Sequence, residues 1–136
     1  MEAGHRGAGR ENSMGLNIML PFEQDANPII AGDPKLVHMR YFFTRKLMFV
    51  KECDAVVCLA GGFGTLDELF EVVTLVQTRK AKQVPIVLYG SDYWKRLIDF
   101  AFLADEGVIS PEDVKLFEYV DTPGDAWDAI KRFYAL

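Results

Sequence analysis

Three glycines and a threonine follow an apolar run in the middle of the chain, in the order Gly61-Gly62-Phe63-Gly64-Thr65. The run itself, residues 54–59, is typical of a buried strand, and a helix is predicted from Thr65 onward. In such a strand–loop–helix unit, backbone N–H groups and the positive end of the helix converge on an anion, and glycines let the backbone approach a phosphate closely. The Thr65 hydroxyl can add a further donor. The pattern therefore predicts a phosphate-binding loop; the alternative is a tight turn without a ligand, since neither Gly-x-x-x-x-Gly-Lys-Ser/Thr nor Gly-x-Gly-x-x-Gly is present.

Two carboxylates and two cations could complete this site. Glu68 lies one turn into the predicted helix and Glu71 one turn further, on a helix that is apolar around most of its circumference. Carboxylates on such an apolar helix indicate a functional role near the ligand. The alternative is that they are solvated residues, which the positive end of the helix dipole favours at this position. Arg45 and Lys46 lie on an amphipathic helix ahead of the same strand. Arginine there could supply a bidentate contact to phosphate or ribose, and a solvated basic pair is the alternative.

Strands and helices alternate along the chain around these residues. The patterns predict helices over residues 1–10, 41–51, 65–80, 92–104 and 122–134, and strands over residues 15–20, 54–59, 85–89 and 116–120. Residues 21–34 contain three prolines, which predicts a long loop. Ser110-Pro111, followed by two acidic residues, is typical of a helix start. Strands that are apolar on both faces and alternate with helices indicate an α/β fold, a doubly wound parallel sheet with helices on both faces.

Length and composition exclude several classes of protein. The 136 residues fit one domain, and half of them are hydrophobic, which excludes a disordered chain. Fifteen Lys and Arg against 20 Asp and Glu give a net charge of −5, the wrong sign for wrapping a nucleic acid. Because no apolar run approaches ~20 residues and the N-terminus lacks an apolar signal segment, we expect no membrane span and a cytoplasmic location.

The cysteines and histidines do not form a metal-binding pattern. Cys53 and Cys58 are five residues apart, and His5 and His38 are distant from them in sequence. A zinc site needs closer and more regular spacing, so we expect no metal and two reduced, buried thiols.

The pair Arg45-Lys46 followed by Gly61-Gly62-x-Gly64-Thr65-x-x-Glu68 resembles the LOG family, long labelled "lysine decarboxylase-like". That family carries Pro-Gly-Gly-x-Gly-Thr-x-x-Glu with an upstream Arg-Lys pair. Residues 15–24 (GLNIMLPFEQ), 41–46 (YFFTRK) and 63–77 are also similar to its bacterial members, so the resemblance covers nearly the whole chain. It implies one LOG-like nucleotide-binding domain over residues 1–136, with a Rossmann-like fold.

The resemblance also implies an activity. The family consists of nucleoside 5′-monophosphate phosphoribohydrolases, which cut AMP or cytokinin riboside monophosphates into free base and ribose 5-phosphate, as homodimers or larger assemblies and without an organic cofactor. Carried over residue by residue, the catalytic arginine and glutamate fall on Arg45 and Glu68. The substrate-binding positions fall on Lys46, Gly61, Gly62, Gly64 and Thr65.

Two departures from the family pattern bear on this expectation. Ala60 stands where the family has proline, which changes the rigidity of the loop but removes no donor. Met1-Glu2-Ala3 is similar to the middle of a family stretch, so we expect the family's first strands and an upstream glycine-rich loop to be absent; His5 also replaces a common asparagine. A nucleotide-binding or carrier protein without turnover is therefore the alternative function. A pyridoxal phosphate-dependent decarboxylase has no support, because no lysine is marked as a Schiff-base site.

Overall fold

The structure is a computed structural model and describes residues 1–21 and 25–136. The chain divides into two compact units, Met1–Phe49 and Val50–Leu136, and each contains its own small parallel sheet. The predicted α/β class with parallel strands is thereby confirmed. A single domain over residues 1–136 stays a prediction.

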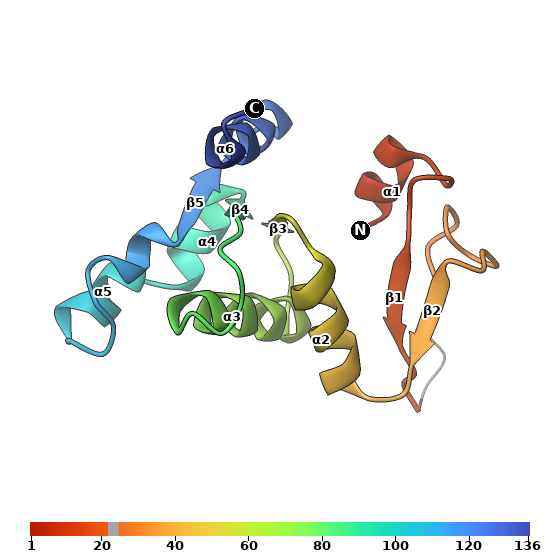
Figure 1. The fold of residues 1–136 in the computed structure, drawn as a ribbon, viewed down its shortest axis with the longest axis horizontal. Helices are drawn as coiled ribbons and strands as arrows, with labels where there is room; N and C mark the ends of the chain where they lie inside the picture. Colours follow the sequence, from red (N-terminus) through yellow and green to blue (C-terminus); the bar gives the residue numbers. More distant parts are fainter. Residues whose placement is uncertain (22–24) are drawn as a thin grey trace. The chain divides into compact units, whose positions relative to one another are not determined.

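The first unit contains α1 (Glu2–Ala8), β1 (Gly15–Ile18), β2 (Leu36–Met39) and most of α2 (Phe42–Glu52) (Figure 1). Strands β1 and β2 pair in parallel, with Gly15 opposite Leu36. The sequence did not predict β2, because this strand has only four residues, is partly exposed throughout and carries a histidine. Of the predicted loop over residues 21–34, residues 22–24 lie outside the described residues.

Asp33 ties the chain between β1 and β2 to the segment that follows α1. Its nearly buried carboxylate accepts hydrogen bonds from the Lys35 backbone N–H (2.9 Å), from Lys35 Nζ (2.9 Å) and from Arg10 Nε (2.8 Å). These donors, the Lys35 backbone N–H first among them, lower the pKa of Asp33 from 3.8 to about 2.

Asp33 is expected to make the first unit sensitive to acid. A carboxyl group whose pKa is lower in the folded than in the unfolded chain stabilises the fold above about pH 4 and loses that contribution as the pH falls to about 2. Replacing Asp33 by Asn should therefore lower the melting temperature at pH 7 and much less at pH 2. Thermal unfolding followed by circular dichroism across this range measures the difference. A melting-temperature gap between the two proteins that is the same at both pH values would contradict the role of Asp33.

The second unit is built on a three-stranded sheet. Strands β3 (Val56–Cys58), β4 (Ile86–Tyr89) and β5 (Phe117–Val120) are parallel and lie in this order. The connecting and following helices are α3 (Phe63–Gln77), α4 (Ser91–Leu97), α5 (Phe100–Asp105) and α6 (Pro123–Tyr134), with a 3₁₀ turn at Asp113–Lys115. Three predicted strands and the predicted helices after the first and last of them are thus confirmed, with ends shifted by a few residues.

One predicted helix was wrong as a continuous element. Residues 92–104 form two helices, because Ile98 takes an extended conformation (φ −139°, ψ 125°) and Asp99 begins a new helix. The Asp99 carboxylate accepts the Phe102 N–H at 3.0 Å, and aspartate is a preferred N-cap residue. Apolar spacing continues across the break, since Ile98 packs against the core, so periodicity alone could not reveal it. The helix start expected at Ser110 leads only to the 3₁₀ turn.

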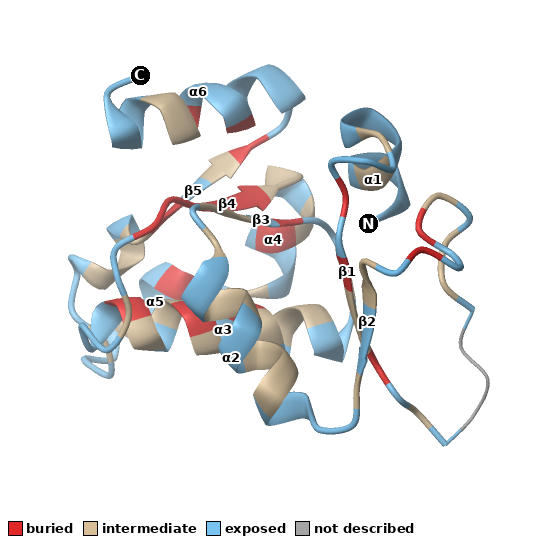
Figure 2. Cartoon of the chain, turned by 45° about the vertical axis from the view of Figure 1, so that its right-hand side comes forward, coloured by how far each residue is buried: buried red, intermediate tan, exposed pale blue. Residues whose placement is uncertain are grey.

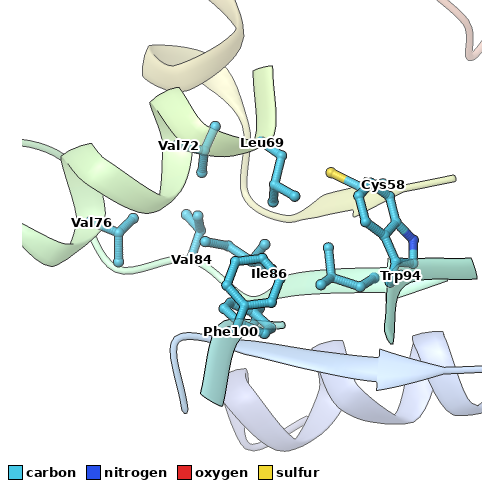
Figure 3. Packing of buried hydrophobic residues seen from close by; sticks show 10 residues of the cluster. Cys58, Leu69, Val72, Val76, Val84, Ile86, Trp94 and Phe100 are labelled. Carbon is cyan, nitrogen blue, oxygen red and sulfur yellow. The ribbon is translucent and has the colours of Figure 1, made fainter. Parts of the chain in front are cut away.

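Both faces of the three-stranded sheet are covered by helices. Leu69, Val72 and Val76 of α3 point toward Ile86 of β4 and toward Phe100 and Trp94 on the following helices (Figure 3). On the opposite face, Val87 and Val120 pack against Ala126 and Ala129 of α6. Figure 2 shows the buried parts of the helices and strands in red. Successive strand residues, such as Ile86, Val87 and Leu88, are therefore all buried, as expected for the central strand of a parallel sheet.

Candidate functional site

The carboxyl ends of β3, β4 and β5 meet at one edge of the sheet in the second unit, because the strands are parallel. Each strand leads into a helix: β3 into α3, β4 into α4 and β5 into α6. The positive ends of these helix dipoles therefore belong to the same edge of the sheet. Ligands of open α/β sheets bind outside the carboxyl ends of the strands, which makes this edge the candidate site.

Two of the three helix starts are capped by side chains of the protein. The Asp121 carboxylate accepts hydrogen bonds from the Ser91 N–H and from Ser91 Oγ, both at 2.8 Å, at the start of α4. The Thr122 hydroxyl accepts the Asp125 N–H at 3.1 Å at the start of α6. Each of these contacts uses one backbone donor that an anion could otherwise bind.

The start of α3 differs from both. Its N-cap residue is Gly62, which makes no side-chain cap hydrogen bond. The N-cap of α4 is also a glycine, Gly90, but there Asp121 supplies the capping side chain. The first N–H groups bonded back to the Gly62 carbonyl belong to Thr65 (3.0 Å) and Leu66 (3.1 Å). The amides of Phe63 and Gly64 precede these bonds and have no partner within the helix. A 15-residue helix with such a start can bind an external anion with its backbone.

The three glycines of the loop differ in what an added side chain would meet. A Cβ on Gly61 would clash with Thr65 Oγ1 and would lie 2.9 Å from Thr65 Cβ, so the packing of Thr65 on the loop excludes a side chain at this position. A Cβ on Gly62 or Gly64 would meet no atom within 4 Å, and neither residue has a positive φ. Packing and conformation therefore do not require glycine at positions 62 and 64, and the backbone there is open to an approaching group.

Glu68 lies beside this loop. It is half-buried in the second turn of α3, and its negative charge, after burial as the larger cause, helps to raise the pKa of the Cys58 thiol to about 11. Cys58 is the last residue of β3, so the Glu68 carboxylate is near the point where the strand ends and the glycine loop begins. The structure thus brings the predicted residues Gly61 to Thr65 and Glu68 together. It also confirms Cys58 as a buried thiol, while Cys53 is half-buried.

Arg45 and Lys46 belong to the first unit. The Arg45 Nε donates to the Leu16 carbonyl of β1 at 3.0 Å, and its guanidinium lies over the Phe49 ring at 5.0 Å from the ring centre. The first contact ties α2 to β1, and the second, between two residues of α2, orients the arginine. That Arg45 and Lys46 act on the same ligand as Glu68 stays a prediction.

One residue of the site was missed by the sequence analysis. Tyr93, in the first turn of α4, donates its hydroxyl hydrogen to the Gly61 carbonyl at 2.5 Å. The only available signal was a tyrosine shortly after a strand, which is too common a feature to indicate a contact 32 residues away. Among residues 1–21 and 25–136, no three His, Cys, Asp or Glu side chains are grouped as metal ligands, and no helix is long and apolar enough to cross a membrane.

Comparison with known proteins places the chain in a family. The family model described as "Possible lysine decarboxylase" matches residues 1–130. A probable cytokinin riboside 5′-monophosphate phosphoribohydrolase of Oryza sativa subsp. japonica, LOGL5, is 34% identical over 138 residues, which cover 90% of this chain and 54% of that protein. The cytokinin riboside 5′-monophosphate phosphoribohydrolase LOG7 of Arabidopsis thaliana is 40% identical over 68 residues, covering 49% of this chain and 31% of LOG7.

The chain spans about half the length, or less, of the curated relatives that it matches. The family match nevertheless includes every predicted site residue, from Arg45 to Glu68. This match over nearly the whole chain shows that the protein belongs to the LOG family of lysine decarboxylase-like proteins.

Proposed function

We propose that the protein is a nucleoside 5′-monophosphate phosphoribohydrolase, which cleaves AMP or cytokinin riboside monophosphates to free base and ribose 5-phosphate. The observation that carries the proposal is the start of α3, where a glycine N-cap and the first backbone amides of the helix, which have no partner within it, lie beside the half-buried Glu68. The names of the matched relatives, which are phosphoribohydrolases of cytokinin riboside monophosphates, support the same reaction.

The glycine loop supplies the binding half of this reaction. The amides of Phe63 and Gly64 donate to the 5′-phosphate, and the α3 dipole favours its negative charge. Thr65, held against Gly61, fixes the shape of the loop. Arg45 and Lys46 add positive charge around the phosphate or ribose, with arginine suited to bidentate contact.

Glu68 supplies the catalytic half. It lies four residues beyond Gly64 on the same helix, or about 6 Å along the axis, so a substrate held by its phosphate would present its ribose to this carboxylate. As the C1′–N bond breaks, its electron pair leaves with the base and positive charge develops on the ribose, which the Glu68 carboxylate stabilises. The same carboxylate orients a water molecule, whose oxygen forms the new bond to C1′. One proton of this water is transferred to the departing base.

Binding of AMP tests the substrate class before turnover is considered. The chain should bind AMP much more tightly than adenosine, because the proposed site recognises the phosphate, and inorganic phosphate should compete. Isothermal titration calorimetry with the three ligands gives this comparison. Equal affinity for AMP and adenosine, or no binding of AMP, would overturn the proposed site. Binding without turnover would instead support the carrier function.

Replacement of Gly64 by Ala should change stability and binding in opposite directions. Alanine is preferred over glycine inside a helix by about 0.5–1 kcal/mol, and the added methyl group meets no protein atom. The melting temperature should therefore rise slightly. The same methyl group occupies space that the phosphate needs, and overpacking of ~1–3 kcal/mol corresponds to a loss in AMP affinity of about tenfold or more.

Gly124 provides a matched control for this substitution. It is also the second residue of a helix, α6, and a Cβ there would make only an ordinary contact of 3.6 Å with Thr122 Oγ1. Gly124→Ala should stabilise the protein in the same way and leave AMP affinity unchanged. Equal AMP affinity in Gly64→Ala and the parent protein would show that the phosphate does not approach this part of the loop.

We further infer a homodimer in the cytoplasm, in line with the family resemblance. An unusually large part of α3 is apolar, and while Leu69, Val72 and Val76 are buried in the core, Phe63 is 92% and Phe70 is 40% exposed. Exposed aromatic side chains on one helix favour a protein–protein contact there.

A further inference from the structure

We propose that Tyr93 is a positioning residue, which acts through Gly61 to aim the backbone amides of the glycine loop at the substrate phosphate. The proposal rests on the proposed function, since it assigns a role within the same phosphate site. Its basis is the hydrogen bond from the Tyr93 hydroxyl to the Gly61 carbonyl at 2.5 Å, which joins the first turn of α4 to the loop after β3.

The Tyr93 ring is held firmly on the sheet. It packs edge-on against Trp94, with ring centres 5.2 Å apart and an interplanar angle of 86°. Trp94 is completely buried, and its Nε1 donates to the Tyr89 carbonyl of β4 at 3.1 Å. The start of α4 is fixed as well, by the two hydrogen bonds from Ser91 to Asp121 after β5. The hydroxyl of Tyr93 is therefore a fixed donor, whose position follows from the pairing of β3, β4 and β5.

The bond determines how the peptide between Gly61 and Gly62 is oriented. A trans peptide is planar, and its C=O and N–H groups point in opposite directions. When Tyr93 holds the Gly61 carbonyl, the Gly62 N–H must point away from Tyr93. Glycine on both sides would otherwise allow this peptide to rotate easily, since neither residue has a Cβ to restrict it.

Rotation of this peptide would matter for an anion. In the rotated form, the Gly61 carbonyl oxygen would take the place of the Gly62 N–H. The negative partial charge of this oxygen would repel the phosphate, whereas the N–H can donate a hydrogen bond to it. Tyr93 thus excludes the conformation of the loop that is unsuitable for phosphate. The side chain itself need not touch the substrate.

Tyr134 offers a control with the same chemistry. Its hydroxyl donates to the Asp54 carbonyl at 2.6 Å, so it also bonds a backbone carbonyl next to β3, but at the end of the strand opposite the glycine loop. Tyr93→Phe and Tyr134→Phe each remove one hydroxyl and leave the ring. Each should cause a similar small loss of stability, and only the first should affect the loop.

The test combines a measurement without ligand and one with AMP. In ¹⁵N relaxation experiments on the full chain without ligand, Tyr93→Phe should increase the motion of the amides of residues 61–64, and Tyr134→Phe should not. In titrations, Tyr93→Phe should weaken AMP and inorganic phosphate about two- to tenfold, the effect of one hydrogen bond, and Tyr134→Phe should match the parent. In the hydrolysis reaction, the loss should appear in KM and leave kcat nearly unchanged.

The possible outcomes separate this inference from the proposed function. An unchanged loop and unchanged AMP affinity in Tyr93→Phe would overturn the positioning role, as would equal losses in both variants, which would indicate general destabilisation. If the parent protein binds no AMP, the proposed function fails, and the relaxation data still decide whether Tyr93 holds the loop. Should Tyr93→Phe unfold, exchange of the Tyr93 hydroxyl proton in the parent protein decides instead: the proposal predicts protection relative to the exposed Tyr41, and equal exchange contradicts it.

Discussion

Replacement of Glu68 by Gln is expected to lower kcat for AMP by about 10²–10³-fold while AMP binding remains nearly unchanged. Glutamine keeps the size of glutamate and its ability to form hydrogen bonds, but it lacks the negative charge that opposes the positive charge on the ribose. That charge develops only as the C1′–N bond breaks, so its loss affects the transition state and not the bound substrate. Steady-state rates of base release, together with calorimetric AMP titration, measure the two effects separately.

Glu71→Gln is the matched control for this variant. Glu71 is also half-buried on α3, one turn further from the glycine loop, and the same substitution removes the same charge. Its kcat should fall much less than that of Glu68→Gln, because the Glu71 carboxylate lies one turn further from the loop. Near-normal hydrolysis by Glu68→Gln, or equal losses in both variants, would show that the Glu68 carboxylate has no specific role in the reaction.

Replacement of Arg45 by Ala is expected to raise KM and lower kcat, with a combined loss of about ten- to a hundredfold in kcat/KM. This corresponds to the ~1.5–3 kcal/mol typical of a hydrogen bond to a charged group. The contact is expected in both the bound substrate and the transition state, unlike that of Glu68. Removing the side chain also takes away the bond from Arg45 Nε to the Leu16 carbonyl and the contact with Phe49, so the melting temperature should fall as well.

Arg40→Ala and Arg45→Lys separate these effects. Arg40 is an exposed arginine just before α2 that lies over the Tyr41 ring, and its removal should leave both KM and kcat unchanged. Arg45→Lys keeps the positive charge but loses the planar, bidentate geometry, so we expect partial activity. If Arg45→Ala lowered only the melting temperature and left kcat/KM unchanged, the arginine would serve only to hold α2 against β1.

The parts of the fold that the sequence predicted are those with strong local patterns. Residues 85–89 are an uninterrupted apolar run, and Thr122-Pro123 combines a capping side chain with a favoured first helical residue, so β4 and α6 were predicted close to their observed bounds. The strand β2 lacks such a pattern. Its four residues are stabilised by pairing with β1, a partner that is distant in sequence. Likewise, the helix breaks at Ile98 because Asp99 caps a new helix, while the apolar spacing continues across the break. Periodicity therefore does not reveal it.

The candidate site shows the same division between local and distant information. Gly61 to Thr65 and Glu68 lie on one continuous strand–loop–helix segment, so their proximity follows from the order of the elements and was predicted. Tyr93 could not be found in this way. It reaches Gly61 only because β3 and β4 pair in parallel, which brings the helix after β4 beside the loop after β3.

The measurement that tests the central claim most directly is product analysis after incubation of the purified chain with AMP. The proposed reaction predicts adenine and ribose 5-phosphate in equal amounts, formed by the parent protein and almost not at all by Glu68→Gln. Chromatography of the base and an enzymatic assay of the sugar phosphate quantify both products. Release of adenosine and inorganic phosphate, or tight binding of AMP without any release of adenine, would contradict the assignment as a phosphoribohydrolase.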